Sequence, residues 1–313
     1  MVSLPGERRK VPAVPRGRRR LVVSLTAIPP RFSLIGPALR SLLSQSVRPD
    51  EIALNLPDRY MRFPGHHPDP DVPEGVSIHR VGTDLGPATK ILPTLRRLEG
   101  IDANVVYVDD DMVHDRRLLA RLLAGQSGRP DDAICERGAN LDVLTGLSCP
   151  PSRTPLAGRR GGLGGGWRYR LVRFATLGFA KPKALRLHAN RPGYVQVAEG
   201  FGGVLIRSGM MPREAFDPPP VAVPVDDIWL SGMLEKAGVG IWVGPRVAHK
   251  QGSRARPVAA LADATFDGQG RVALNRACAL HLAREHGVWP GLLDQVPERQ
   301  DRVNGPSAVT AMA

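Results

Sequence analysis

The chain has 313 residues, of which 42% are hydrophobic, and its formal net charge is +13. Its three cysteines form no CxxC pair, which argues against a disulfide framework and a structural zinc site and favours a reducing compartment. No stretch of about 18 apolar residues predicts a membrane-spanning helix. The basic excess raises three anionic partners, a nucleic acid, an acidic membrane surface or a nucleotide diphosphate; the alternative is charge that serves solubility alone.

Residues 1–20 are basic and rich in proline, and they lack the apolar segment of a secretory signal. We expect a disordered tail there, in a cytoplasmic protein. Peripheral contact of this tail with an anionic membrane, at its inner face, is left open. The rest of the chain divides into a domain over residues 21–250, with halves at 21–125 and 126–250, and a C-terminal helical extension over 251–313.

Strands and helices alternate in the first half of the domain, which predicts right-handed crossovers. Strands are predicted at residues 21–26, 51–56, 76–81 and 104–108, and helices at 35–44, 87–98 and 118–123. We therefore expect an α/β fold with a mainly parallel central sheet flanked by helices.

The second half is less regular. Strands are predicted at residues 133–135, at 204–206 after a glycine-rich approach, and at 239–243, with helices from 228 to 234 and from 274 to 285. The basic, glycine-rich stretch that begins at Arg153 and runs to residue 191 is predicted to hold a flexible loop. Whether this loop covers an anionic ligand or is a surface insertion stays open.

Three consecutive aspartates, Asp109, Asp110 and Asp111, follow the predicted strand over residues 104–108. The carboxyl ends of parallel strands are where open α/β sheets bind ligands. So many like charges on one turn favour a hard divalent cation, Mn²⁺ or Mg²⁺, which takes carboxylate oxygens and shares them with phosphates. The alternative is an acidic turn that caps the helix near residue 118.

A second acidic pair, Asp226 and Asp227, lies more than a hundred residues later. If both clusters reach one edge of the sheet, one can hold a cation while the other accepts a proton from a reacting hydroxyl. The alternative is that this pair caps the helix near residue 228. Lys90 is a candidate point charge for phosphate, and His249 a candidate ligand for the same cation. For both residues, an ordinary surface position is the alternative.

Three segments, over residues 22–31, 39–46 and 49–52, resemble the opening of nucleotide-sugar-dependent glycosyltransferases with the GT-A fold, close to glycosyltransferase family 2. The resemblance covers about residues 20 to 250. It implies a Rossmann-like nucleotide-sugar-binding half followed by an acceptor half. The implied reaction moves a sugar from a nucleoside-diphosphate sugar to a hydroxyl of a saccharide or other acceptor, with inversion, and involves no nucleic acid.

The same resemblance assigns roles to the acidic clusters. The triplet corresponds to the family's DxD motif, in which Asp109 and Asp111 hold Mn²⁺ or Mg²⁺, Asp109 and Asp110 contact the donor, and His249 is a late third ligand. Asp226 and Asp227 fall at the catalytic pair, with the second as base. The remaining donor-binding residues implied by the resemblance are Thr26, Arg31, Asp84, Lys90, Gly202 and Gly203.

The chain departs from the family pattern in two ways. It lacks the Gln/Arg-rich acceptor motif, and its catalytic pair consists of two aspartates instead of Glu-Asp. The acceptor and the stereochemical outcome are therefore left open.

Two other interpretations remain. A haloacid-dehalogenase-like phosphatase would use Asp109 as a nucleophile on phosphorus, in the pattern D-x-D-x-T/V that ends at Val113. That motif normally ends the first strand of its domain, whereas three predicted strands come before it here. A non-catalytic binder of nucleic acid or membrane would explain the charge of +13. It leaves the two carboxylate clusters, which repel phosphate backbones, unexplained.

Overall fold

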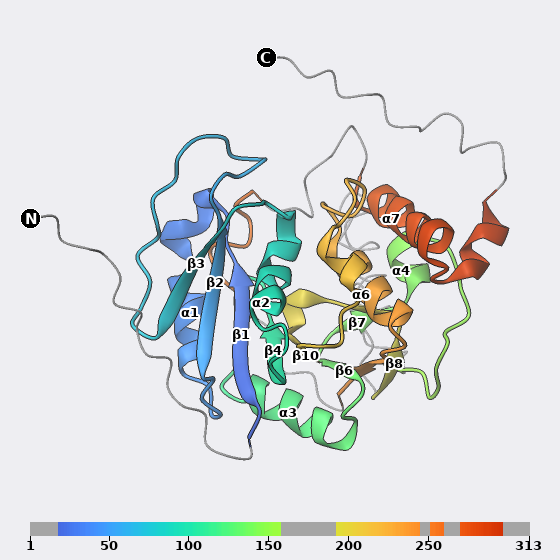
Figure 1. Cartoon of the computed structure of the whole chain (residues 1–313), viewed down its shortest axis with the longest axis horizontal. Coiled ribbons are helices and arrows are strands. Elements are labelled where there is room, and N and C mark those ends of the chain that lie inside the picture. Colours follow the sequence, from blue (N-terminus) through green and yellow to red (C-terminus); the bar gives the residue numbers. More distant parts are fainter. Residues whose placement is uncertain (1–17, 158–191, 245–250, 260–269, 297–313) are drawn as a thin grey trace, which may run out of the picture.

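The computed structural model describes residues 18–157, 192–244, 251–259 and 270–296. One eight-stranded sheet with the order β3-β2-β1-β4-β10-β6-β11-β8 runs through them (Figure 1). Its strands are β1 (Arg20–Thr26), β2 (Glu51–Pro57), β3 (Val76–Val81), β4 (Ala103–Tyr107), β6 (Ala133–Cys135), β8 (Gly193–Val195), β10 (Val204–Arg207) and β11 (Ile241–Val243). All run in one direction except β10 and β8. The predicted, mainly parallel α/β sheet is confirmed.

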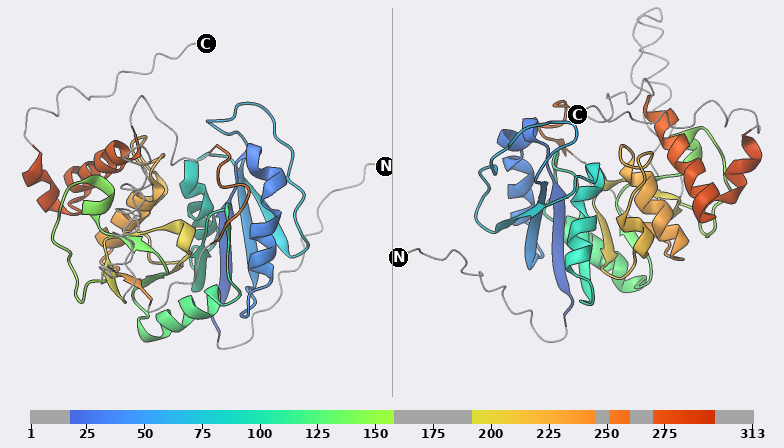
Figure 2. Two further views of the ribbon diagram at one scale, coloured as in Figure 1. Left: turned by 180° about the vertical axis from the view of Figure 1, so that it is seen from behind. Right: turned by 45° about the horizontal axis from the view of Figure 1, so that its top comes forward.

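Helices cover both faces of this sheet, as the two views in Figure 2 show. One face carries α1 (Gly36–Leu43) and α3 (Leu118–Gly128), and the other carries α2 (Leu92–Arg97), α4 (Leu141–Thr145), α6 (Asp226–Lys236) and α7 (Arg271–His286). Short 3-10 helices lie at Pro29–Leu34, Gly86–Lys90, Gly200–Gly202, Arg213–Phe216 and Pro290–Gln295. The predicted C-terminal helix is thus confirmed as α7.

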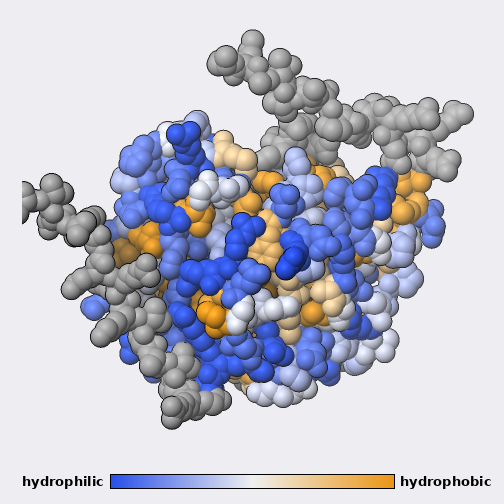
Figure 3. Space-filling model, in the orientation of Figure 1, coloured by the Kyte–Doolittle hydropathy of each residue, from blue (hydrophilic) through white to orange (hydrophobic). Residues whose placement is uncertain are grey.

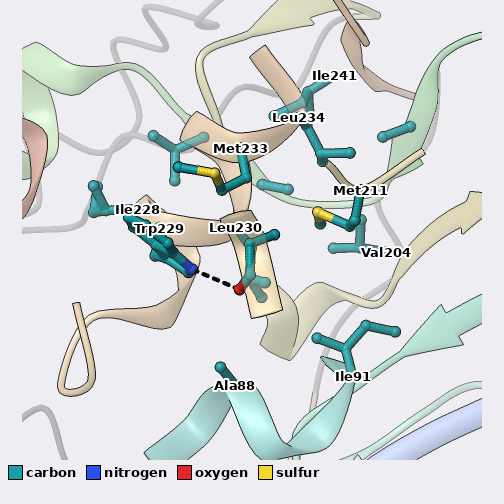
Figure 4. Close-up of a cluster of buried hydrophobic side chains, with 14 of the residues drawn as sticks. Ala88, Ile91, Val204, Met211, Ile228, Trp229, Leu230, Met233, Leu234 and Ile241 are labelled. Carbon is teal, nitrogen blue, oxygen red and sulfur yellow. Dashed lines mark hydrogen bonds between the residues drawn. The ribbon is translucent and has the colours of Figure 1, made fainter. Parts of the chain in front are cut away.

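The alternation of side chains along β1 explains the two hydrophobic clusters. Leu21, Val23 and Leu25 pack with α1 and α3, while Val22 belongs to the cluster on the other face. Successive residues of a strand point to opposite faces, so a strand covered on both sides is apolar throughout. In the second cluster Trp229 is fully buried, and its indole N–H donates to the carbonyl of Ala215 at 3.0 Å (Figure 4).

Two short strand pairs lie outside the main sheet. β5 (Met112–Val113) pairs with β12 (Gln251–Gly252), and β7 (Gly138–Ala139) pairs with β9 (Val197–Ala198). The first pair returns the chain after residue 250 to the acidic turn, where the N–H of Ser253 donates to the carbonyl of Asp111 at 2.8 Å. The segment that follows the predicted domain boundary therefore contacts the predicted site.

The helix predicted over residues 87–98 is divided into a 3-10 helix, Gly86–Lys90, and α2. Pro93 is the cause, because it donates no hydrogen bond and its ring would clash with the carbonyl of Thr89 in a continuous α-helix. Ile91 between the two segments has φ −132°. The break leaves Lys90 at the end of the first segment, with 3% of its surface exposed.

The end of the predicted tail belongs to the fold, since residues 18–20 are ordered and Arg20 begins β1. Three ion pairs hold this stretch: Arg18–Asp50 at 2.5 Å, Arg19–Asp102 at 2.7 Å and Arg20–Glu51 at 2.6 Å. Part of the positive charge is thus neutralised within the chain.

Hydrophilic residues cover most of the face in Figure 3. Within the described ranges, no helix has the length and apolar character needed to span a membrane.

Glu51 is a buried carboxylate at the start of β2, with its side chain 8% exposed. Desolvation alone would raise its pKa, but the hydrogen bond from His79 and the charge of Arg97 outweigh it and lower the pKa to about 2. His79 lies 2.9 Å from the carboxylate and Arg97 lies 2.6 Å from it. Since the folded pKa is depressed, the carboxylate stabilises the fold above pH 4.5, and this contribution is lost as the pH falls toward 2.

We expect Glu51→Gln to lower the free energy of unfolding by about 3 kcal/mol at pH 7 and by less than half of that at about pH 3. Urea unfolding of both proteins at the two pH values measures the difference. Glu99→Gln is the matched control, because Glu99 is exposed, and it should change little at either pH. An equal loss at both pH values for Glu51→Gln would mean that the ion pairs do not stabilise the fold.

Candidate active site

Three segments that are distant in sequence meet at the carboxyl end of β4 (Figure 1). Asp109 follows this strand directly. β10 runs antiparallel to β4 with Val204 opposite Tyr107, so the glycine-rich turn before β10 arrives at the same edge. The first turn of α6 brings Asp226 to this edge as well. The two acidic clusters thus meet at one edge of the sheet, which is the condition that the sequence analysis set for a shared site.

Neither acidic cluster caps a helix through a side-chain hydrogen bond. After the triplet the chain forms β5, and α3 then starts with Arg117 as its N-cap and no acidic residue in its first turn. The alternative of a capping role for the triplet is therefore wrong. Asp226 and Asp227 do lie in the first turn of α6, where their charge suits the helix dipole, but the N-cap position belongs to Val225.

Lys90 lies between the two clusters. Its Nζ donates to Asp109 Oδ1 at 2.6 Å, lies 2.8 Å from Asp226 Oδ2 and is 3.9 Å from Asp227 Oδ1. The contact with Asp226 is an ion pair by distance but lacks the angles of a hydrogen bond. Desolvation acts to lower the pKa of Lys90, but the carboxylates overcome this and hold the pKa well above its ordinary value. The ammonium is therefore charged.

Asp227 is the acidic residue of the pair that reaches solvent, with 22% of its side chain exposed against 5% for Asp226. Its Oδ1 accepts the N–H of Gly200 at 3.0 Å. Desolvation and then the charge of Asp226 raise its pKa to about 7, while Lys90 acts in the opposite direction. A carboxylate with this pKa exchanges protons near neutral pH, as a general base must.

The triplet divides into a buried residue and two accessible ones. Asp110 is 5% exposed, and its Oδ1 receives Arg31 Nη1 at 2.6 Å. The same Nη1 lies 3.4 Å from Asp111, and Arg31 Nε donates to the carbonyl of Val258 at 2.9 Å. Burial raises the pKa of Asp110 to about 7 against the charge of Arg31. Asp109 and Asp111 have side chains 33% and 17% exposed, so they face solvent at the edge.

The carboxylates at this edge of the sheet are suitable ligands for Mn²⁺ or Mg²⁺. Five carboxylates meet two buried cations, Lys90 and Arg31, so negative charge is in excess. The described part of the chain contains no group of three or more His, Cys, Asp or Glu side chains arranged around a metal position. Mg²⁺ commonly binds through only one or two carboxylates and takes its other ligands from water and substrate phosphates. Asp109 and Asp111 are such a pair, whereas His249 lies outside the described residues.

Two predicted donor-binding residues form hydrogen bonds with backbone groups of neighbouring segments. The hydroxyl of Thr26 donates to the carbonyl of Asn55 at 2.8 Å. Asp84 accepts the N–H groups of Met61 at 2.9 Å and Gly86 at 2.8 Å. Thr26 thus links β1 to β2, and Asp84 links the segments at Met61 and Gly86. Contact of either residue with a donor stays a prediction.

The two predicted glycines lie where a side chain would clash with a neighbour or strain the backbone. A Cβ on Gly202 would lie 2.6 Å from the side chain of Arg137, and Gly203 has φ +82°, which a residue with a side chain rarely adopts. They let the chain turn tightly into β10 beside the acidic cluster.

The structure adds three residues that the sequence did not single out. Gly200 donates to Asp227, and any side chain on it would collide with the Lys90 ammonium. The ring of Tyr107 lies 5.7 Å from the same ammonium. Arg256 opposes the rise in the pKa of Asp111 that desolvation and Asp109 cause. Only Gly200, within the glycine-rich approach, carried a sequence signal; the position of Arg256 depends on the β5–β12 pair.

Neither a protein-family model nor a curated protein matches the sequence. Among solved structures, the chain is similar to GalNAc-T7 with UDP, GalNAc and Mn²⁺, at 11% identity and a TM-score of 0.47, over 87% of this chain and 50% of that one. It is also similar to glucosyl-3-phosphoglycerate synthase from Mycobacterium tuberculosis with Mn²⁺, UDP-glucose and phosphoglyceric acid, at 14% identity and a TM-score of 0.41, over 86% and 80%.

A third similar structure is 4-diphosphocytidyl-2C-methyl-D-erythritol synthase, at 11% identity and a TM-score of 0.39, over 77% of this chain and 96% of that one. For GalNAc-T7, the aligned part spans only half of that protein's chain. Likenesses this distant carry no argument about chemistry, because one fold supports many functions. The function is inferred from the site itself.

Proposed function

We propose that this protein is a metal-dependent glycosyltransferase of the GT-A type, which moves a sugar from a nucleoside-diphosphate sugar to a hydroxyl of a saccharide or other acceptor, with inversion. The observation that carries this proposal is the meeting of two carboxylate clusters at the carboxyl end of β4, where Asp109 and Asp227 lie 2.6 and 3.9 Å from the Lys90 ammonium. One cluster is suited to a cation and a diphosphate, and the other to a reacting hydroxyl.

Asp109 and Asp111 would hold Mn²⁺ or Mg²⁺ together with the donor diphosphate. When bound, the cation would offset the charge that grows on the departing diphosphate. Arg31 holds the acidic turn in place through Asp110 and Asp111. Asp110 is the buried member of the turn. We propose that it maintains the shape of the donor site and does not contact the metal directly.

Asp227 would act as the base. The acceptor oxygen forms a bond to the anomeric carbon while the bond from that carbon to the diphosphate oxygen breaks on the opposite face, and the hydroxyl proton passes to Asp227. The bond from the Gly200 N–H fixes one oxygen of this carboxylate. A single displacement of this kind inverts the anomeric centre.

Donor contacts by Thr26, Asp84, Gly202 and Gly203 complete the proposal. They lie at the end of β1, shortly after β3 and before β10. In this proposal these segments bind the nucleoside and the sugar.

Calorimetric titration with UDP, GDP, CDP and dTDP, each with Mn²⁺ and with EDTA, tests the function. We expect one nucleotide to bind at least about 100-fold more tightly with Mn²⁺, because the cation joins two carboxylates to the diphosphate. That nucleotide identifies the base of the donor. If none binds and the protein releases phosphate from a general ester with Mg²⁺, the phosphatase interpretation replaces this one. Retention of DNA at moderate salt would instead favour a nucleic-acid binder.

A further inference from the structure

The Lys90 side chain occupies a closed position that its sequence context did not predict. The side chain is 4% exposed, and its ammonium contacts Asp109 after the end of β4 and Asp226 at the start of α6. Gly200 lies so close that its missing side chain makes room for the ammonium, and the Tyr107 ring is on another side at 5.7 Å. The ammonium is therefore surrounded by protein groups.

The backbone of Lys90 is fixed as well. Its carbonyl accepts the hydroxyl of Ser24 at 2.5 Å, and this hydroxyl also lies 2.7 Å from that of Thr94. Asn55 donates to both hydroxyls, at 3.1 and 2.9 Å. Ser24, Asn55 and Thr94 belong to β1, β2 and α2, so a buried polar network anchors the backbone of Lys90 to the sheet.

We propose that Lys90 is a positioning residue that joins the two acidic clusters through its ammonium, and that it does not bind the donor phosphates. It would hold the turn after β4 against the first turn of α6 and so fix the distance between the donor and the base. The catalytic part of this inference rests on the proposed function, but the joining of the clusters does not.

Charge and geometry both favour this role. A lysine that binds phosphate must be accessible to the phosphate. This ammonium is buried and already has three carboxylate neighbours within 3.9 Å. Removing it would leave Asp109, Asp226 and Asp227 close together without their shared cation. Buried carboxylates without a partner are strongly unfavourable. The ion pair therefore determines how these segments lie.

A double-mutant cycle in EDTA tests the joining of the clusters without any substrate. We expect Lys90→Met to lower the melting temperature by about 10 °C, and Asp226→Asn added to it to restore at least half of that loss, because one unpaired charge is removed. If Lys90→Met does not fold, recovery of folding in the double variant gives the same answer. Lys236→Met, which breaks the exposed pair with Glu214, is the matched control and should change little. A double variant no more stable than Lys90→Met would overturn the proposal.

Nucleotide binding and turnover then separate positioning from phosphate contact. In Lys90→Met, or in the double variant if only that one folds, we expect the affinity for the nucleotide identified above to stay within about threefold with Mn²⁺. The turnover number should fall about 100-fold while the donor KM changes little, since the base is displaced and the donor contacts remain. A tenfold or greater loss of nucleotide affinity would show that Lys90 binds phosphate and would overturn the proposal. If the wild-type protein binds no nucleotide, the proposed function fails, and the thermal cycle alone decides whether Lys90 joins the clusters.

Discussion

Asp227→Asn is expected to lower the rate of sugar transfer by about 10³-fold and to leave metal-dependent nucleotide binding within about twofold. The amide keeps the shape of the side chain and can still accept the Gly200 N–H, but it cannot take a proton from the acceptor. The loss should therefore appear in the turnover number and not in the affinity for the nucleotide. Transfer assays and calorimetry on the same preparation measure the two effects.

The pH dependence of transfer provides a second measure of the same role. Because desolvation and Asp226 raise the pKa of Asp227 to about 7, the wild-type rate should rise as the pH increases through about 7, when the carboxylate loses its proton. The variant should lack this rise. Asp217→Asn, at an exposed aspartate, serves as the control and should match the wild type. Full activity in Asp227→Asn would require another base.

Asp111→Asn is expected to weaken metal-dependent nucleotide binding by more than about 100-fold, because it removes one of the two accessible carboxylates that would hold the cation. The side chain of Asp111 is 17% exposed, and Arg31, which lies 3.4 Å away, still pairs with Asp110 at 2.6 Å in the variant. The loss of one charge should therefore leave the turn folded. Calorimetry with Mn²⁺ and the preferred nucleotide measures the change. Binding in EDTA should be the same in both proteins.

Two other aspartates sharpen this experiment. Asp102 precedes β4 at the opposite end of the strand, with 54% of its side chain exposed, so Asp102→Asn should bind nucleotide as the wild type does. Asp110→Asn should instead lower the melting temperature, because it breaks the buried pair with Arg31 at 2.6 Å. If Asp111→Asn bound the nucleotide with unchanged affinity in the presence of Mn²⁺, Asp111 would not be a metal ligand.

Much of the fold was predictable from local pattern. The strands predicted at residues 51–56 and 76–81 match β2 and β3 to within one residue, because short segments with apolar or β-branched residues between turn residues are typical of strands. The helix predicted over residues 87–98 is wrong as one continuous element, because Pro93 divides it into two segments. The short strands β5, β7, β8, β9 and β12 were not predicted, because two or three residues rarely carry enough pattern. Of the three-residue strands in the described ranges, β6 and β11 were predicted and β8 was not.

The sequence by itself determined the chemical inventory: which carboxylates exist, that Asp109 and Asp111 follow a buried strand, and that Asp226 and Asp227 begin a helix. Spacing along a chain does not specify which side chains touch. Only the tertiary structure decided that Asp110 is buried against Arg31 while its neighbours face solvent, and that Lys90 lies between the clusters. The contact of Lys90 with Asp226 and that of Arg31 with the carbonyl of Val258 join residues more than a hundred positions apart. They depend on the return of α6 and of the segment after β12 to this edge of the sheet. Desolvation at that meeting point sets the pKa of Asp227, so its suitability as a base is a property of the folded protein.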